Sequence, residues 1–168
     1  MGDAPAIAPA PATTDLSDAY AATLAYLAPH FRDYGGVTGF CGEIVTLRTY
    51  EDNTQLRALL ETPGAGRVIV VDGAASPACA LFGGNLAELG AQNGWAGVVI
   101  NGYVRDTGEL LAAKIGVKAL GTHPKKSEKR GIGDVDVMLK IDGADIYPGD
   151  WLYADADGVI ISAKPLSL

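Results

Sequence analysis

The sequence predicts a domain of the α/β class. Arg67 to Val71 is a short, continuous apolar run, as expected for a strand buried on both faces, and Gly97 to Ile100 is a second such run. Between them lie a glycine-rich loop and a stretch, Asn85 to Asn93, with leucines at helical spacing. A strand, a loop, a helix and a second strand of this size form the βαβ unit of α/β sheets. The 168 residues are enough for one such domain.

The N-terminal segment is expected to be a tail followed by a helix. Residues 1–14 are rich in Ala and Pro, which is typical of a flexible tail, so we expect a single domain over residues 15–168. A helix is predicted next, because apolar side chains recur at helical spacing up to Pro29. Its cap would be one of three polar residues, Thr13, Thr14 or Asp15.

A strand and a short helix are predicted before the βαβ unit. Residues 41–49 alternate between two faces in the manner of a strand. Asp52 or Asn53 is then expected to cap a short leucine-bearing helix, which the Pro-Gly-Ala-Gly sequence at residues 63–66 ends.

The remainder of the chain predicts one more helix and several strands. Thr107 to Lys114 is expected to be helical, and Val117 to Leu120 to form a short strand. Three further strand-like runs, 135–141, 151–154 and 159–162, are separated by Asp-Gly and Pro-Gly-Asp turns. The acidic residues of this region do not have the spacing of an EF-hand, so we interpret them as turn formers and a solvated face.

Composition excludes several classes of protein. A formal net charge of −7 argues against direct binding of nucleic acid over a broad surface. No run approaches the roughly 18–20 apolar residues of a membrane span, and the N-terminus lacks the pattern of a signal peptide. Cys41 and Cys79 have no metal-type spacing, so we expect small buried side chains in a cytoplasmic protein. The 22 glycines indicate turns or close approaches to the backbone.

The loop at Gly83-Gly84-Asn85-Leu86 is the first candidate for chemistry. In open α/β sheets, ligands bind beyond the carboxyl ends of the strands, which is where this loop is predicted to lie. Unpaired amides at the start of a helix attract a carboxylate or a phosphate, and glycines let the anion approach. The alternative is an ordinary glycine-assisted turn into a helix.

The second candidate follows the next predicted strand. Arg105 offers a planar fork for a substrate carboxylate, and Asp106 is an oxygen ligand suited to Mg²⁺ or Mn²⁺. Glu109 lies three residues later and would share a helix face with Asp106. Each residue alone is compatible with a surface ion pair or a helix-start acid, so it is their combination with the glycine loop that favours a site.

Together these residues resemble a known signature. Gly83-Gly84, twenty residues, Arg105-Asp106, two residues and Glu109 match the pattern of metal-dependent 4-hydroxy-4-methyl-2-oxoglutarate aldolases, which share a family with the regulator of ribonuclease activity A. The resemblance extends over residues 30–163 and includes VIVVDGAAS, IGVKALGTHPKKS and YPGDWLYADADGVIIS. Such proteins have also been labelled demethylmenaquinone methyltransferases, but the sequence has no glycine-rich methyl-donor fingerprint.

The resemblance implies a fold, an assembly and a set of roles. The fold would be a layered α/β sandwich of the swivelling β/β/α type, assembled as a homotrimer with active sites between subunits. Arg105 would bind substrate oxygens and orient a proton-donating water, Asp106 would hold the divalent cation, and Glu109 completes the predicted catalytic set. Many members have Asp where Gly84 stands, and that acid helps to hold metal-bound water. Backbone amides for the pyruvyl carboxylate would come from Gly83, Gly84, Asn85 and Leu86.

The implied reaction is the retro-aldol cleavage of a 4-hydroxy-2-oxo diacid to pyruvate and a second oxo acid. Mg²⁺ or Mn²⁺ would stabilise the pyruvate enolate, and oxaloacetate decarboxylation would pass through the same enolate. A Schiff-base route needs a desolvated lysine, and nothing in the sequence favours any of Lys114, Lys118 or Lys140.

The alternative function is that of a non-catalytic regulator that binds a ribonuclease. The basic stretch Lys125 to Arg130 could contact RNA or an acidic partner, although we interpret it as a solvated loop.

Overall fold

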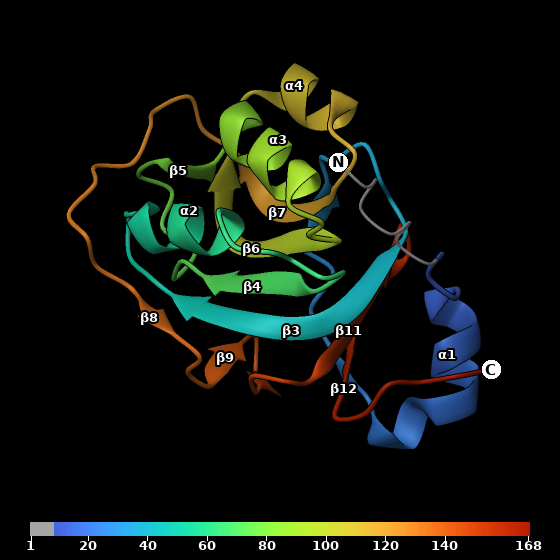
Figure 1. Cartoon of the computed structure of the whole chain (residues 1–168). Coiled ribbons are helices and arrows are strands. Elements are labelled where there is room, and N and C mark those ends of the chain that lie inside the picture. The colour runs from blue at the N-terminus through green and yellow to red at the C-terminus, as the bar shows by residue number, and fades with distance from the viewer. Residues whose placement is uncertain (1–8) are drawn as a thin grey trace.

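One curled sheet organises the computed structural model, which describes residues 9–168 (Figure 1). The strand order is β1-β12-β11-β3-β4-β6-β7-β2, with β5 beside β6 and β8 beside β3. The strands β3, β4, β6 and β7 run parallel, and the strands at both ends are antiparallel. The sheet contains β1 (Ala25–Tyr26), β2 (Arg32–Asp33), β3 (Phe40–Arg48), β4 (Val68–Asp72), β5 (Ala80–Phe82), β6 (Gly97–Val104), β7 (Gly116–Thr122), β8 (Asp134–Val135), β11 (Trp151–Asp155) and β12 (Gly158–Ser162).

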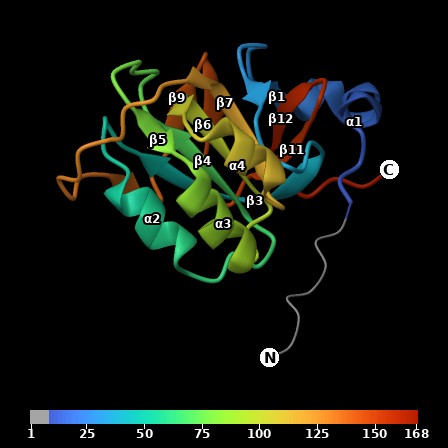
Figure 2. The ribbon, with the colours of Figure 1, turned by 90° about the horizontal axis from the view of Figure 1, so that it is seen from above.

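Helices cover one face of the parallel strands, and a hairpin covers the other. Figures 1 and 2 show α2 (Thr54–Leu60), α3 (Gly84–Gln92) and α4 (Thr107–Ala112) together on one side of the sheet. The hairpin of β9 (Leu139–Ile141) and β10 (Ala144–Ile146) packs against the opposite side. Helix α1 (Thr13–Tyr20) packs on β11 and β12. The predicted layered α/β fold is confirmed.

The continuous apolar strands serve two cores at once. Residues 68–71 of β4 are all 0% exposed. Ile69 and Val71 face the core beneath the helices, whereas Val68 and Val70 face the core beneath the β9–β10 hairpin. A strand buried on both faces cannot alternate with polar residues, which is why this run is apolar throughout.

Two glycines make room for an aromatic ring. Phe40 is 1% exposed and lies across β6 and β7. A Cβ atom at Gly97 would lie 2.4 Å from a ring carbon of Phe40, and one at Gly116 would lie 2.1 Å away. Part of the glycine excess therefore allows close packing inside the sheet, in addition to forming turns.

The N-terminal helix is shorter than predicted. It ends at Tyr20 and continues as a 3₁₀ turn, η1 (Ala21–Thr23), so the expectation of a helix up to Pro29 is wrong. Ala25 and Tyr26 instead pair with β12, because that strand offers backbone partners. The N-cap is Ala12, without a side-chain cap bond, so none of the three candidate residues occupies the cap position. Residues 1–8 of the predicted tail lie outside the described residues.

Thr13 is part of the folded domain. Its amide and Oγ1 donate to the carboxylate of Asp155 at 2.8 and 2.6 Å. The side chain of Thr13 is 4% exposed. The helix therefore begins before residue 15, where the sequence placed the start of the domain.

Three other elements differ from the sequence prediction. The predicted strand over 135–141 is interrupted at Asp136, whose φ of 59° is left-handed, and its two halves pair with β3 and β10. Strand β6 runs four residues beyond Ile100 because β5 and β7 supply partners there. Helix α4 ends at Ala112, before Lys114.

Candidate active site

Two paired strands bring the two parts of the predicted signature together. Strand β5 lies parallel to the end of β6, with Phe82 opposite Val104. The amide of Arg105 donates to the carbonyl oxygen of Phe82 at 2.9 Å. Gly83 and Asp106, which follow these strand ends, consequently lie side by side at the same edge of the sheet.

Asp106 is held against the glycine loop. Its Oδ2 accepts a hydrogen bond from the amide of Gly84 at 3.0 Å. A Cβ atom at Gly83 would lie 2.7 Å from the same oxygen, so a side chain at residue 83 would displace Oδ2 of Asp106. Asp106 itself is left-handed, with φ of 61° and ψ of 50°. Such backbone conformations are tolerated by Asp and are concentrated at functional sites.

The start of α3 offers two backbone amides to an anion. The first helical bond runs from the amide of Ala87 to the carbonyl of Gly83 at 3.0 Å. Among the described residues, no group accepts a hydrogen bond from the amides of Asn85 and Leu86. The amide of Gly84, which the sequence assigned to the substrate carboxylate, is instead occupied by Asp106.

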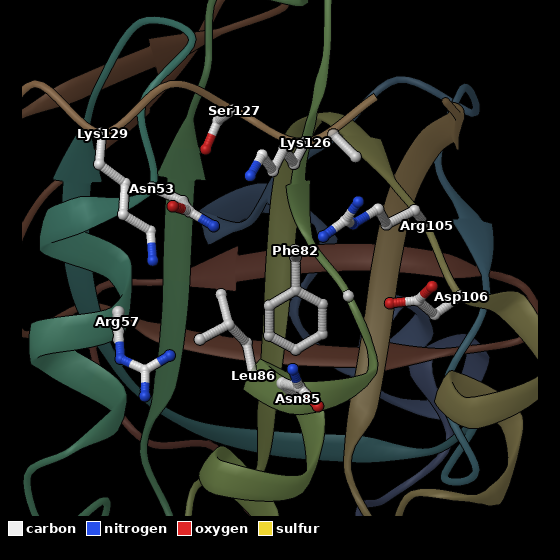
Figure 3. A pocket seen from close by; sticks show the side chains of 12 residues that line it. Asn53, Arg57, Phe82, Asn85, Leu86, Arg105, Asp106, Lys126, Ser127 and Lys129 are labelled. Atoms are coloured by element: carbon white, nitrogen blue, oxygen red, sulfur yellow. The ribbon is translucent and has the colours of Figure 1, made fainter. Parts of the chain in front are cut away.

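A pocket of about 120 Å³ opens at this edge (Figure 3). Four of its lining side chains are cationic and one is a carboxylate. Figure 3 shows Arg105 and Asp106 on one side and Asn53, Arg57 and Lys129 on the other. The lining consists of Asn53, Arg57, Ala80, Phe82, Gly83, Asn85, Leu86, Arg105, Asp106, Lys126, Ser127 and Lys129. Such a balance of charge fits an anionic ligand.

Glu109 and Gly84 face a different groove. They line a depression between α3 and α4, outside the pocket that contains Asp106. A Cβ atom at Gly84 would lie 1.7 Å from Oε2 of Glu109. The Glu109 side chain therefore occupies the space that an Asp at position 84 would need.

Among the described residues, two buried polar atoms in side chains that line the pocket lack partners. Asn53 donates through Nδ2 to the carbonyl of Leu81 at 3.1 Å, but its Oδ1 is unpaired. Ser127 is 6% exposed, and its Oγ makes no hydrogen bond. Buried polar atoms normally have a partner, so these two atoms are exceptions beside the pocket.

Sequence reasoning missed one wall of the pocket. Lys126, Ser127 and Lys129 belong to the stretch that we interpreted as a solvated loop, yet all three line the pocket. The available signal was the four basic residues among positions 125–130. Asn53 was considered only as a helix cap. It occupies the N-cap position of α2 without a side-chain cap bond, and the side chain of Asp52 accepts the amide of Thr54 at 2.8 Å.

The donor set suits a hard divalent cation. Among residues 9–168 there is no group of three or more His, Cys, Asp or Glu side chains that could hold a metal. Asp106 is exposed, and its Oδ1 accepts no hydrogen bond from the part of the chain that the structure describes. Mg²⁺ keeps several waters and often uses one or two carboxylates with substrate oxygens, so a single Asp fits Mg²⁺ or Mn²⁺ better than zinc.

The lysines considered for a Schiff base lie outside the pocket. Lys118 is buried, and its Nζ contacts Oδ1 of Asp33 at 3.0 Å and the carbonyl of Asp155 at 2.6 Å. Lys140 pairs with Asp145 at 3.6 Å, and Lys114 lines the groove between α3 and α4. The geometry therefore offers no support for a nucleophile among these three lysines.

The two cysteines form no disulfide within the described residues. Cys79 is buried and Cys41 is half-buried, and both thiols are free. Burial raises the pKa of both thiols. Within the described part of the chain, no helix has the length and apolar character needed to cross a membrane.

Comparisons with known proteins cover nearly the whole chain. The profile of the family described as RraA-like (Aldolase/RraA) matches residues 13–161. A Burkholderia multivorans protein named "Putative 4-hydroxy-4-methyl-2-oxoglutarate aldolase" is 55% identical over 161 residues, which are 93% of this chain and 98% of the relative.

Two solved structures are also similar. The RNA-processing inhibitor RraA from Thermus thermophilis matches with a TM-score of 0.90 and 48% identity, over 94% of this chain and 95% of that one. A Geobacillus kaustophilus structure, titled S-adenosylmethionine: 2-dimethylmenaquinone methyltransferase, matches with a TM-score of 0.88 and 44% identity, over 92% and 96% of the two chains.

Proposed function

This chain belongs to the RraA-like family, and on that premise we propose that it is a divalent-metal-dependent aldolase. It would cleave 4-hydroxy-4-methyl-2-oxoglutarate, or a related 4-hydroxy-2-oxo diacid, to pyruvate and a second oxo acid. It would also decarboxylate oxaloacetate, which forms the same pyruvate enolate. The observation that carries the proposal is the pocket in which Arg105 and Asp106 lie beside the start of α3.

The charges of the pocket support a substrate with two carboxylates. Within residues 9–168, Arg105 makes no ion pair, so its guanidinium is available to bind substrate oxygens. Arg57 and Lys129 lie across the pocket from it (Figure 3). Arg57 is partly neutralised by Glu61 at 3.1 Å, whereas Lys129 has no ion pair with any of the described residues. One carboxylate would therefore meet Arg105 and the other would meet the opposite wall.

The side chains and amides have distinct tasks in this proposal. The amides of Asn85 and Leu86 would hold the pyruvyl carboxylate at the start of α3. The guanidinium of Arg105 would stabilise negative charge that develops on the substrate oxygens and orient a proton-donating water. Asp106 would hold the cation. When bound, that cation supplies a Lewis acid for the ketone oxygen, worth several kcal/mol.

Glu109 would supply the acid that many relatives carry at position 84. Its carboxylate already occupies the space next to Gly84, whose amide binds Asp106. We therefore propose that Glu109 approaches the cation held by Asp106 from the groove between α3 and α4, on the other side of Gly84 from the pocket. We also propose a homotrimer, as expected for the family, which light scattering of the purified protein would test.

Release of pyruvate tests the enzymatic proposal. With Mg²⁺, the protein should produce pyruvate from oxaloacetate and from 4-hydroxy-4-methyl-2-oxoglutarate, above a blank without protein, and EDTA should stop it. Asp106→Ala should abolish turnover, because it removes the cation's carboxylate. Asp18→Ala, at an exposed position on α1, is the matched control and should be fully active. Absence of metal-dependent turnover in the unaltered protein would contradict the proposal.

A second candidate is a regulator that binds a ribonuclease without catalysis. It is favoured by the similarity to the RNA-processing inhibitor RraA at 48% identity. Tight binding to a ribonuclease scaffold, combined with no metal-dependent turnover, would establish this function in place of the first. If binding occurs and Asp106→Ala retains it, the two functions use different surfaces.

A further inference from the structure

One wall of the pocket is a long loop without regular secondary structure. Residues 123–133 connect β7 to β8 and contribute Lys126, Ser127 and Lys129 to the pocket. Loops that are positioned by a rigid scaffold often carry binding residues. Because residues 123–133 form no helix or strand, other parts of the chain must fix the position of their backbone.

The two ends of the loop are attached differently. Near its start, the carbonyl of Lys125 accepts the amide of Ala80 at 2.8 Å, which is an ordinary backbone contact with β5. Near its end, the amides of Arg130 and Ile132 both donate to Oδ2 of Asp52, at 2.7 and 3.2 Å. Gly131 between them has a φ of 75°, which turns the backbone so that both amides face one oxygen. Paired amides in such a turn form a cradle for an anion.

The same carboxylate also holds the opposite wall. Oδ1 of Asp52 accepts the amide and the hydroxyl of Thr54 at 2.8 and 2.6 Å, at the start of α2. Helix α2 and the residue before it carry Arg57 and Asn53, which line the pocket. Asp52 is 0% exposed, and burial alone would raise its pKa, but the hydrogen bonds from Thr54, Arg130 and Ile132 lower the pKa to about 2. It is therefore an ionised link between the two elements at neutral pH.

We propose that Asp52 is a positioning residue that sets the distance between α2 and the cationic loop, and thereby the affinity for the second carboxylate of a diacid. Asp52 does not line the pocket and so acts only through the groups that it holds. The proposal rests on the proposed function for its choice of ligand, a dicarboxylic oxo acid. It predicts an effect on diacids that monoacids do not share, because a monoacid needs only Arg105 and the amides of α3.

Asp52→Asn removes the charge of the link and leaves one side-chain acceptor where the carboxylate has two. With its oxygen toward Arg130 and Ile132, the NH₂ group faces the amide of Thr54, and in the other orientation it faces the two loop amides. In either orientation a single side chain no longer accepts from both elements, so the link between α2 and the loop is weakened, although Arg130 Nη2 still donates to the carbonyl of Tyr50. Thr54→Ala is the complementary variant, since it removes one contact at Oδ1 and leaves both loop contacts in place.

A second pair of variants avoids the buried carboxylate altogether. Gly131→Ala strains the left-handed turn that points the two amides at Asp52, and an added Cβ there meets no atom within 4 Å. Gly143→Ala is its matched control. It has a φ of 81°, equally open surroundings and a position in the β9–β10 turn.

Calorimetric titration with 2-oxoglutarate and with pyruvate, each with Mg²⁺, tests the proposal without requiring turnover. Asp52→Asn and Gly131→Ala should weaken 2-oxoglutarate binding about tenfold, the loss of roughly one charge-assisted contact, and change pyruvate binding less than twofold. Thr54→Ala and Gly143→Ala should leave both affinities unchanged. Hydrogen exchange of residues 123–133 should accelerate in the first two variants only.

Two results would overturn the proposal. If the variants lose affinity equally for 2-oxoglutarate and pyruvate, or if the controls lose as much affinity, Asp52 has a purely structural role. Unchanged 2-oxoglutarate binding in a variant whose loop exchanges faster would show that the loop does not serve the second carboxylate. Because binding is measured directly, these results are separate from failure of the proposed aldolase activity, which would appear as absent pyruvate release from the unaltered protein.

Discussion

Replacing Gly83 by Ala isolates the contact on which the candidate site depends. Gly83 has φ of −149° and ψ of −166°, an extended conformation that alanine adopts without strain. The only consequence of the substitution is therefore the added methyl group. That group would lie 2.7 Å from Oδ2 of Asp106 and 3.2 Å from Cγ of Arg105.

The geometry sets the expected size of the effect. To reach an ordinary contact of 3.4 Å from 2.7 Å, Oδ2 must retreat by about 0.7 Å, which breaks its 3.0 Å bond to the Gly84 amide. Because Asp106 is exposed, we expect the free energy of unfolding to fall by only about 1 kcal/mol. A misplacement of this order in a catalytic group can reduce the rate up to about 100-fold, so we expect kcat/KM for oxaloacetate to fall between about 10- and 100-fold.

Gly108→Ala provides the matched control for this experiment. Position 108 lies two residues after Asp106, and a Cβ atom there meets nothing within 4 Å. Activity with oxaloacetate, Mn²⁺ affinity by calorimetry and stability in urea would be measured for both variants. The steric argument fails if Gly83→Ala retains Mn²⁺ affinity and kcat/KM within twofold, or if Gly108→Ala loses as much.

Two further predictions concern neighbouring carboxylates. Gly84→Asp should lower the free energy of unfolding by about 1–3 kcal/mol, because its Cβ would lie 2.8 Å from Cβ and 1.7 Å from Oε2 of Glu109. In a double-mutant cycle measured in urea, Glu109→Ala should recover part of that loss, and strict additivity would count against the clash. Asp52, whose pKa is lowered from 3.8 to about 2, should contribute about 2 kcal/mol of stability that is fully present above pH 4 and is lost as the pH falls toward 2. Thermal unfolding between pH 2 and 6 should therefore depend less steeply on pH in Asp52→Asn, and identical slopes would contradict the assignment.

The central strands of the sheet could be predicted because burial on both faces requires apolar side chains at consecutive positions. Strand β4 needs an apolar side chain at every position, since one core lies on each of its faces. The antiparallel β11–β12 hairpin was similarly visible from its turn and flanking runs. Strands β1 and β2 were not visible, because two residues carry no periodicity and each depends on a partner far along the chain.

The sequence by itself indicated which residues begin the candidate site. Gly83, Arg105 and Asp106 stood out through their resemblance to a family signature, and pairing of β5 with β6 explains why residues at that spacing lie together. Their roles in binding and catalysis stay predictions that the proposed assays test.

Only the tertiary structure decided what completes the pocket and what lies outside it. The contact between Asp52 and Arg130 joins residues 78 positions apart, and no local pattern specifies such a pairing. The same holds for Glu109, which shares a groove with Gly84 rather than the pocket of Asp106, because the left-handed backbone of Asp106 redirects the chain before α4 begins. Local composition and periodicity indicate whether a residue is buried. Contacts between loops that are distant in the sequence depend on the packing of the whole sheet.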